Sequence, residues 1–124
     1  MKSVSNQLIN ECKAKLLEAK RELMNRVRSG RAEFQTFDKA GGDEADQTMN
    51  LMAENDFLTS QTRLKHQLLE IEFALARIDG GRFGICEETE ELIEEERLRA
   101  LPWTRLSIEG AEIREAAGRR YARP

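Results

Sequence analysis

The stretch GGDEADQT at residues 41–48 places three carboxylates, Asp43, Glu44 and Asp46, directly after two glycines. Glycines followed by acids are typical of a turn that leads into a helix. A carboxylate at a helix start contributes about 0.5–1 kcal/mol, because it accepts unpaired backbone N–H groups and complements the positive end of the helix dipole. The same carboxylates would also present fixed negative charge at a bend in the chain. Helix capping and partner binding are therefore both open for Asp43 and Asp46.

Residues suited to other chemistry are scarce. The two cysteines, Cys12 and Cys86, are far apart in the sequence and do not suggest a disulfide framework, and the single histidine, His66, is expected to be a solvated helix residue. We find no nucleophile–base pair, phosphate-binding loop or metal-ligand set, so we do not expect an enzyme. The net charge of −3 argues against general nucleic-acid binding.

Two long stretches must position the acidic segment. Residues 3–37 and 44–79 both carry apolar side chains at seven-residue spacing, which is typical of a coiled coil. The repeating positions are Ile9, Leu16 and Leu23 in the first stretch, and Phe57, Leu64, Ile71 and Ile78 in the second. Gly30 weakens the first stripe and Gln61 interrupts the second. With a Gly-Gly turn between the stretches, the pattern predicts an antiparallel helical hairpin with its tip at residues 38–48.

The rest of the chain predicts a small helical base. Gly80 and Gly81 end the second long helix, and Pro102 separates helices expected at about residues 90–100 and 104–118. Thr104 is a candidate N-cap for the last of these. We therefore predict an all-α chain, with a coiled-coil hairpin over residues 1–80 and a globular domain with a C-terminal helix over residues 81–124.

Three strings of this sequence resemble one known family. They are ALARIDGGRFGIC at residues 74–86, LIEEERLRALP at residues 92–102 and the acidic GGDEADQT. Their order and separation are similar to those of the DksA/TraR family of bacterial transcription regulators. The resemblance implies a hairpin on a zinc-finger-like base that binds RNA polymerase rather than DNA, with the hairpin in the secondary channel of the polymerase. It also implies that Asp43 and Asp46 come near the polymerase active centre, with Thr48 where the family usually has alanine.

The zinc finger of that family uses two Cys-x-x-Cys pairs, and this sequence departs from it. The four ligand positions are occupied by Cys86, Thr89, Ser107 and Gly110. A structural zinc site needs four donors, with thiolate or imidazole strongly preferred. We therefore predict that the zinc site is lost and that the chain carries no cofactor. Among the large residues nearby, Ile85, Leu101 and Trp103 are expected to fill the space around the former site.

The remaining partner predictions also follow from the resemblance and the composition. Some family members bind the alarmone ppGpp through basic residues, but the corresponding positions here are Glu70, Leu101 and Ala111, so we expect weak or absent ppGpp dependence. No apolar run approaches the ~20 residues of a membrane span, and no signal peptide is evident, so a cytoplasmic location is expected. We expect a monomer that makes no sequence-specific DNA contact. The alternative function is a structural or adaptor coiled coil that assembles with another helical partner.

Overall fold

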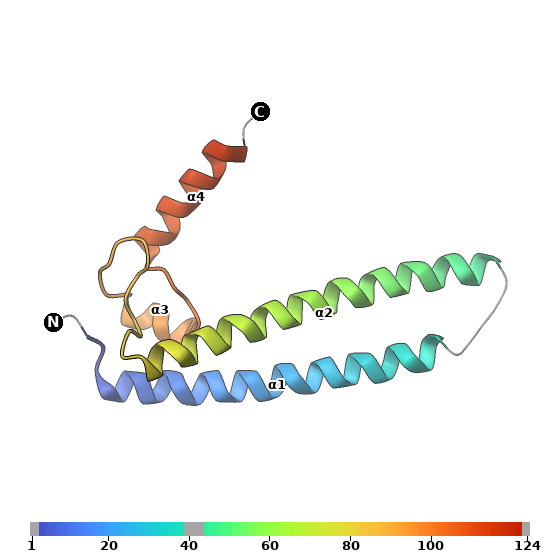
Figure 1. Ribbon diagram of the computed structural model, residues 1–124, viewed down its shortest axis with the longest axis horizontal. Coiled ribbons are helices and arrows are strands. Elements are labelled where there is room, and N and C mark those ends of the chain that lie inside the picture. Colours follow the sequence, from blue (N-terminus) through green and yellow to red (C-terminus); the bar gives the residue numbers. More distant parts are fainter. Residues whose placement is uncertain (1–2, 39–43, 123–124) are drawn as a thin grey trace. The chain divides into compact units, whose positions relative to one another are not determined.

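The structure is a computed structural model that describes residues 3–38 and 44–122. It contains helices α1 (Asn6–Asp38), α2 (Glu44–Asp79), α3 (Glu95–Ala100) and α4 (Ile108–Ala122), shown in Figure 1. In the described part of the chain the only β pairing is an isolated bridge between Ile85 and Leu92. The predicted all-α class is therefore confirmed, and α2 has the bounds that the sequence indicated.

The chain divides into two compact units, and both long helices contribute to each. One unit holds residues 1–18 and 70–124, and the other holds residues 19–69. In the second unit α1 and α2 run antiparallel, because Phe34 stacks on Phe57 at 4.4 Å between ring centroids while Val27 lies opposite Gln61. Leu23 is buried in the same seam. The heptad positions read from the sequence thus pair the two helices as a hairpin.

Gly30 and Gln61, the two interruptions of the apolar stripes, lie against each other. A Cβ on Gly30 would lie 3.0 Å from Gln61 Nε2, so the glycine makes room for the amide. Gln61 is only 6% exposed, and its Nε2 donates a long hydrogen bond of 3.5 Å to the Val27 carbonyl. Its Oε1 is buried without a hydrogen-bond partner. The seam therefore contains a polar defect that costs stability.

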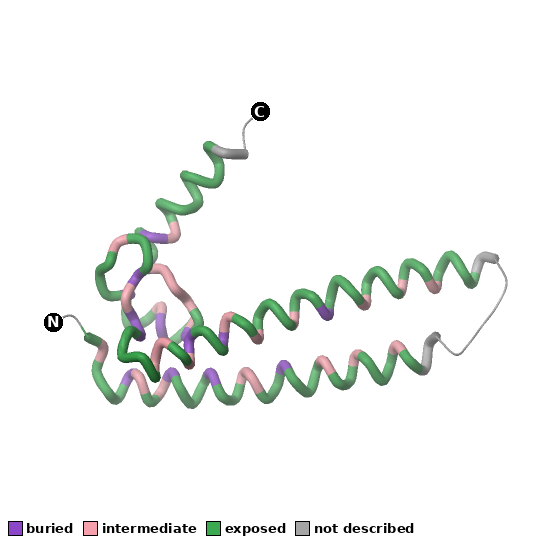
Figure 2. Tube along the Cα trace, in the orientation of Figure 1, coloured by how far each residue is buried: buried purple, intermediate pink, exposed green. Residues whose placement is uncertain are grey.

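The hydrophobic core of the first unit joins the start of α1 to the segment after α2. The buried positions, purple in Figure 2, include Leu8, Cys12, Phe83, Cys86, Ile93 and Leu98. The Cys12 thiol donates to the Leu98 carbonyl at 3.5 Å, which ties α1 to α3. Each fully buried apolar side chain contributes about 1.5–3 kcal/mol, so this cluster stabilises the first unit.

The two short helices of the base begin later than the sequence predicted. Residues 86–94 contain a turn and the bridge at Leu92, with Cys86 N–H donating to the Glu91 carbonyl at 2.8 Å, and α3 begins only at Glu95. The N-cap predicted at Thr104 is wrong, because α4 begins at Ile108. Ser107 takes the capping position instead, and its Oγ accepts the Gly110 N–H at 3.0 Å.

Candidate functional site

The structure describes two of the three predicted tip residues. Asp43 lies outside the described residues, whereas Asp46 and Thr48 lie in the first turns of α2 and are exposed. Residues two apart on a helix point to different sides, so Asp46 and Thr48 do not share a face. Met49 and Met52 lie three and six positions after Asp46 and are each 63% exposed. Because residues three apart are neighbours on a helix, Met49 lies next to both Asp46 and Met52 at this end of α2.

The four positions of the family's zinc ligands do come together. The Thr89 N–H donates to Cys86 Sγ at 3.5 Å. A Cβ on Gly110 would collide with the same sulfur and would lie 3.4 Å from Ser107 Oγ. Cys86 is fully buried and Ser107 is 5% exposed. We call this group of Cys86, Thr89, Ser107 and Gly110 the sulfur pocket.

The sulfur pocket does not fit a zinc ion. It offers one thiol, two hydroxyl groups and a glycine without a side chain, whereas structural zinc takes four nitrogen or sulfur donors. In the described part of the chain, no three His, Cys, Asp or Glu side chains are placed to hold a metal. The family's metal therefore has no set of donors at these positions.

The sulfur of Cys86 lies in a strongly polar environment for a buried group. Burial raises the pKa of this thiol, but the hydrogen-bonding groups of Ser107 and Thr89 together outweigh it and lower the pKa to about 6. Of the large residues expected to fill this space, Trp103 is 37% exposed, and Ile85 and Leu101 are half-buried and lie outside the buried cluster that contains Cys86. The Cys86 sulfur lies where a side chain at position 110 would begin.

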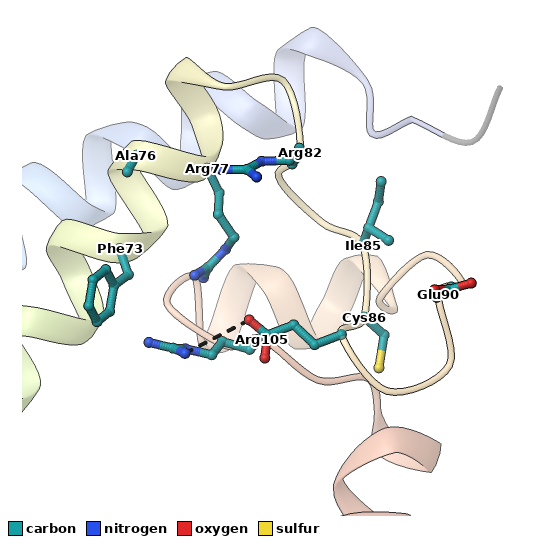
Figure 3. A pocket seen from close by; sticks show the side chains of 9 residues that line it. Phe73, Ala76, Arg77, Arg82, Ile85, Cys86, Glu90 and Arg105 are labelled. Carbon is teal, nitrogen blue, oxygen red and sulfur yellow. Dashed lines mark ion pairs between the residues drawn. The ribbon is translucent and has the colours of Figure 1, made fainter.

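A cavity of about 500 Å³ lies beside the sulfur pocket, between the end of α2 and the segment before α4. It is lined by Phe73, Ala76, Arg77, Arg82, Ile85, Cys86, Glu87, Glu90 and Arg105. Figure 3 shows Arg77 and Arg105 approaching each other across it, with the Cys86 sulfur turned away from both. Burial, followed by the neighbouring charge of Arg105, lowers the pKa of Arg77.

Two of the three arginines that line this cavity, Arg77 and Arg105, make contacts within the chain. Arg105 donates two hydrogen bonds to the Glu70 carboxylate, at 3.0 and 3.1 Å, and its guanidinium lies 4.8 Å from the centre of the Phe73 ring. Arg77 donates to the Trp103 carbonyl at 3.1 Å and to the Thr104 carbonyl at 3.4 Å. These bonds fasten the segment before α4 onto α2. No local sequence pattern predicts these bonds, because Arg105 lies 35 positions from Glu70.

One of the three alarmone positions named from the resemblance is thus already in an ion pair. Glu70 is held by Arg105, while Leu101 and Ala111 are half-buried. None of the three supplies a cation. None of the helices within the described residues combines the length and apolarity that crossing a membrane requires.

Comparison with known proteins places the chain among bacterial regulators. Residues 81–116 match the prokaryotic DksA/TraR C4-type zinc finger. The chain is 32% identical over 103 residues to the RNA polymerase-binding transcription factor DksA of Caulobacter vibrioides, covering 83% of this chain and 72% of that protein. It is 31% identical over 112 residues to an uncharacterized protein of Aquifex aeolicus, covering 88% of this chain and 77% of that one.

A solved structure agrees with these sequence matches. The transcription factor DksA2 from Pseudomonas aeruginosa superimposes with a TM-score of 0.84 at 30% identity, over 93% of this chain and 88% of that one. The similarity therefore includes the hairpin as well as the finger segment. The fold and these relatives together show that the chain belongs to the DksA/TraR family.

Proposed function

We propose that this protein is a transcription regulator that binds bacterial RNA polymerase through the secondary channel and places its acidic tip near the active centre. The observation that carries the proposal is the match to a relative named as an RNA polymerase-binding transcription factor, at 32% identity over 72% of that protein's length. The fold match to DksA2 supports the same reading, because it includes both long helices. The Caulobacter and Pseudomonas relatives are both named as transcription factors, which favours regulation over catalysis.

The chemistry of the proposed tip rests on Asp46. This carboxylate is exposed in the first turn of a long helix, where the backbone gives it a defined position. Oxygen ligands of this kind attract Mg²⁺ and basic side chains, both of which are expected at a polymerase centre. Thr48 adds a hydroxyl group and a stiff β-branched side chain where the family usually has alanine. We expect this substitution to weaken or redirect the effect of the tip.

The proposal does not include a strong response to ppGpp. A polyphosphate needs cations or clustered N–H donors, and the position of Glu70 contributes a carboxylate that is already paired with Arg105. In transcription assays with saturating protein, the effect of the chain should therefore be equal with and without ppGpp. A strong ppGpp-dependent enhancement that needs this chain would contradict that expectation.

Binding to purified polymerase and an Asp46→Asn variant test the proposal together. The variant keeps the size of the side chain and removes its charge, so helicity and polymerase binding should persist while the effect on transcription is lost. Asp56→Asn is a matched control, because Asp56 is an exposed residue on the same helix, away from the tip. It should retain both binding and regulation.

Each other outcome has a definite meaning. Absence of binding to polymerase would refute the proposal and favour the adaptor coiled coil. A variant that binds and regulates normally but melts at a lower temperature would assign Asp46 to helix capping alone.

A further inference from the structure

We propose that the base of this protein is held together without metal, by packing of the Cys86 sulfur into the gap left by Gly110 and between the polar groups of Thr89 and Ser107. In a zinc finger, a metal ion ties two turns together through four side chains. Here the same two turns meet around a single sulfur. The inference does not depend on polymerase binding, since it concerns the stability of the chain alone.

The first turn presents the sulfur. Glu90 N–H donates to the Cys86 carbonyl at 2.9 Å, and Thr89 N–H donates to Cys86 Sγ at 3.5 Å. These bonds close residues 86–90 into a tight turn that holds the sulfur in the interior. A buried polar group is tolerated when donors surround it, so the turn offsets part of the cost of burying the thiol.

The second turn, at Ser107 and Gly110, packs against the Cys86 sulfur. Ser107 caps α4 through the 3.0 Å bond from Gly110 N–H, which fixes the position of Gly110 relative to the cap. Backbone bonding links the two turns directly, because Glu87 N–H donates to the Arg105 carbonyl at 2.9 Å. On the outer side, Arg114 reaches from α4 to Glu88 at 3.0 Å. The turns are therefore joined by several contacts, none of which needs an ion.

Gly110 is the residue on which the arrangement depends. It is buried, and a Cβ there would collide with the Cys86 sulfur while making only an ordinary contact of 3.4 Å with the Glu88 Cβ. Its backbone φ is not in the left-handed region, so conformational freedom does not explain the glycine. The remaining explanation is steric, because the volume that any other side chain would need at position 110 is occupied by the Cys86 sulfur.

Gly110→Ala compared with Gly118→Ala tests this directly. Both glycines lie in α4, but a Cβ on Gly118 meets nothing within 4 Å. Overpacking of a filled interior typically costs enough to lower the thermal midpoint of a chain of this size by about 5–15 °C, so Gly110→Ala should show such a loss. Gly118→Ala should leave the midpoint unchanged or raise it by a few degrees, since alanine favours helix. Equal midpoints for the two variants would overturn the proposal.

Removal of the sulfur should rescue the defect. In the double variant Cys86→Ala with Gly110→Ala, the new methyl group enters the space left by the sulfur. The fall in thermal midpoint of the double variant should therefore be clearly smaller than the sum of the falls measured for the two single variants. This arm remains decisive if Gly110→Ala fails to fold, because the double variant should then recover a folded state. Additive losses, or a double variant that stays unfolded, would show that sulfur is not what the glycine accommodates.

Metal content gives an independent readout. The purified chain should contain far less than one zinc per molecule by elemental analysis, and a strong chelator should not shift its thermal midpoint. Stoichiometric zinc, or a chelator-induced fall in the midpoint, would contradict a metal-free base.

Discussion

Gln61→Leu is expected to stabilise the hairpin, because the Gln61 amide is buried in the seam and makes little hydrogen bonding there. Gln61 Oε1 is buried without a partner, and leaving such a group unsatisfied costs about 1–3 kcal/mol. The single hydrogen bond from Nε2, at 3.5 Å, lies at the limit of hydrogen-bonding distance and contributes little to stability. Leucine has a similar size and leaves Gly30 undisturbed. We therefore expect a net gain of about 1–3 kcal/mol, or a rise in Tm of roughly 4–12 °C.

The assay for this prediction should separate the hairpin from the base. Thermal unfolding followed by helical circular dichroism gives the overall shift, and amide hydrogen exchange of residues 19–69 shows whether protection increases near the substitution. Gln67→Leu is the matched control, since Gln67 is exposed on the same helix and its replacement should change stability by less than about 0.5 kcal/mol. A Gln61→Leu variant that is no more stable than wild type, or less stable, would refute the reasoning that Gln61 is a defect.

Three further predictions concern the base. Gly84→Ala should lower the free energy of unfolding by about 3 kcal/mol or more, measured in urea, because Gly84 has a φ of 87° and a Cβ there would collide with the Val4 side chain. Stability should rise with pH between about 6 and 8.5, by at most about 3 kcal/mol, because the native Cys86 thiol has its pKa lowered to about 6 and an unfolded thiol titrates near 8.5. This contribution is lost as the pH falls through 6, and urea titrations of Cys86→Ala across the same range should lack the rise. Arg105→Ala should cost about 1–2 kcal/mol by the same assay, since it leaves the partly buried Glu70 carboxylate unpaired; a loss below about 0.3 kcal/mol would mean that solvent already screens the pair.

The hairpin could be predicted from the sequence because its determinants are local and periodic. The seven-residue spacing of apolar positions and the glycines at the turn required no knowledge of the rest of the chain. The same reasoning could not see that Gln61 would be buried, since hydrophobic patterning treats a polar residue as an interruption. Burial of Gln61 depends on the opposite helix, where Gly30 provides the space.

The base was harder to predict because long-range contacts set its helix ends. The late start of α4 is fixed by Ser107 and by the Glu94 carboxylate, which accepts the Ile108 N–H at 3.1 Å from 14 positions away. Thr104 looked like a cap but bonds to Leu106 instead. The loss of zinc ligands could be read from the four positions directly. What replaces them could not, because a glycine in a sequence does not reveal which atom needs its space.

The most direct test of the proposed function is to locate the tip within the polymerase complex. A photo-crosslinking amino acid at Met49, exposed beside Asp46, should form crosslinks to polymerase peptides that line the active centre. The same probe at Glu112, exposed on α4, should crosslink elsewhere on the polymerase. Crosslinks from position 49 to the active-centre peptides are the result that the account predicts. Crosslinks from position 112 but none from position 49 to that region would contradict delivery of the tip through the secondary channel.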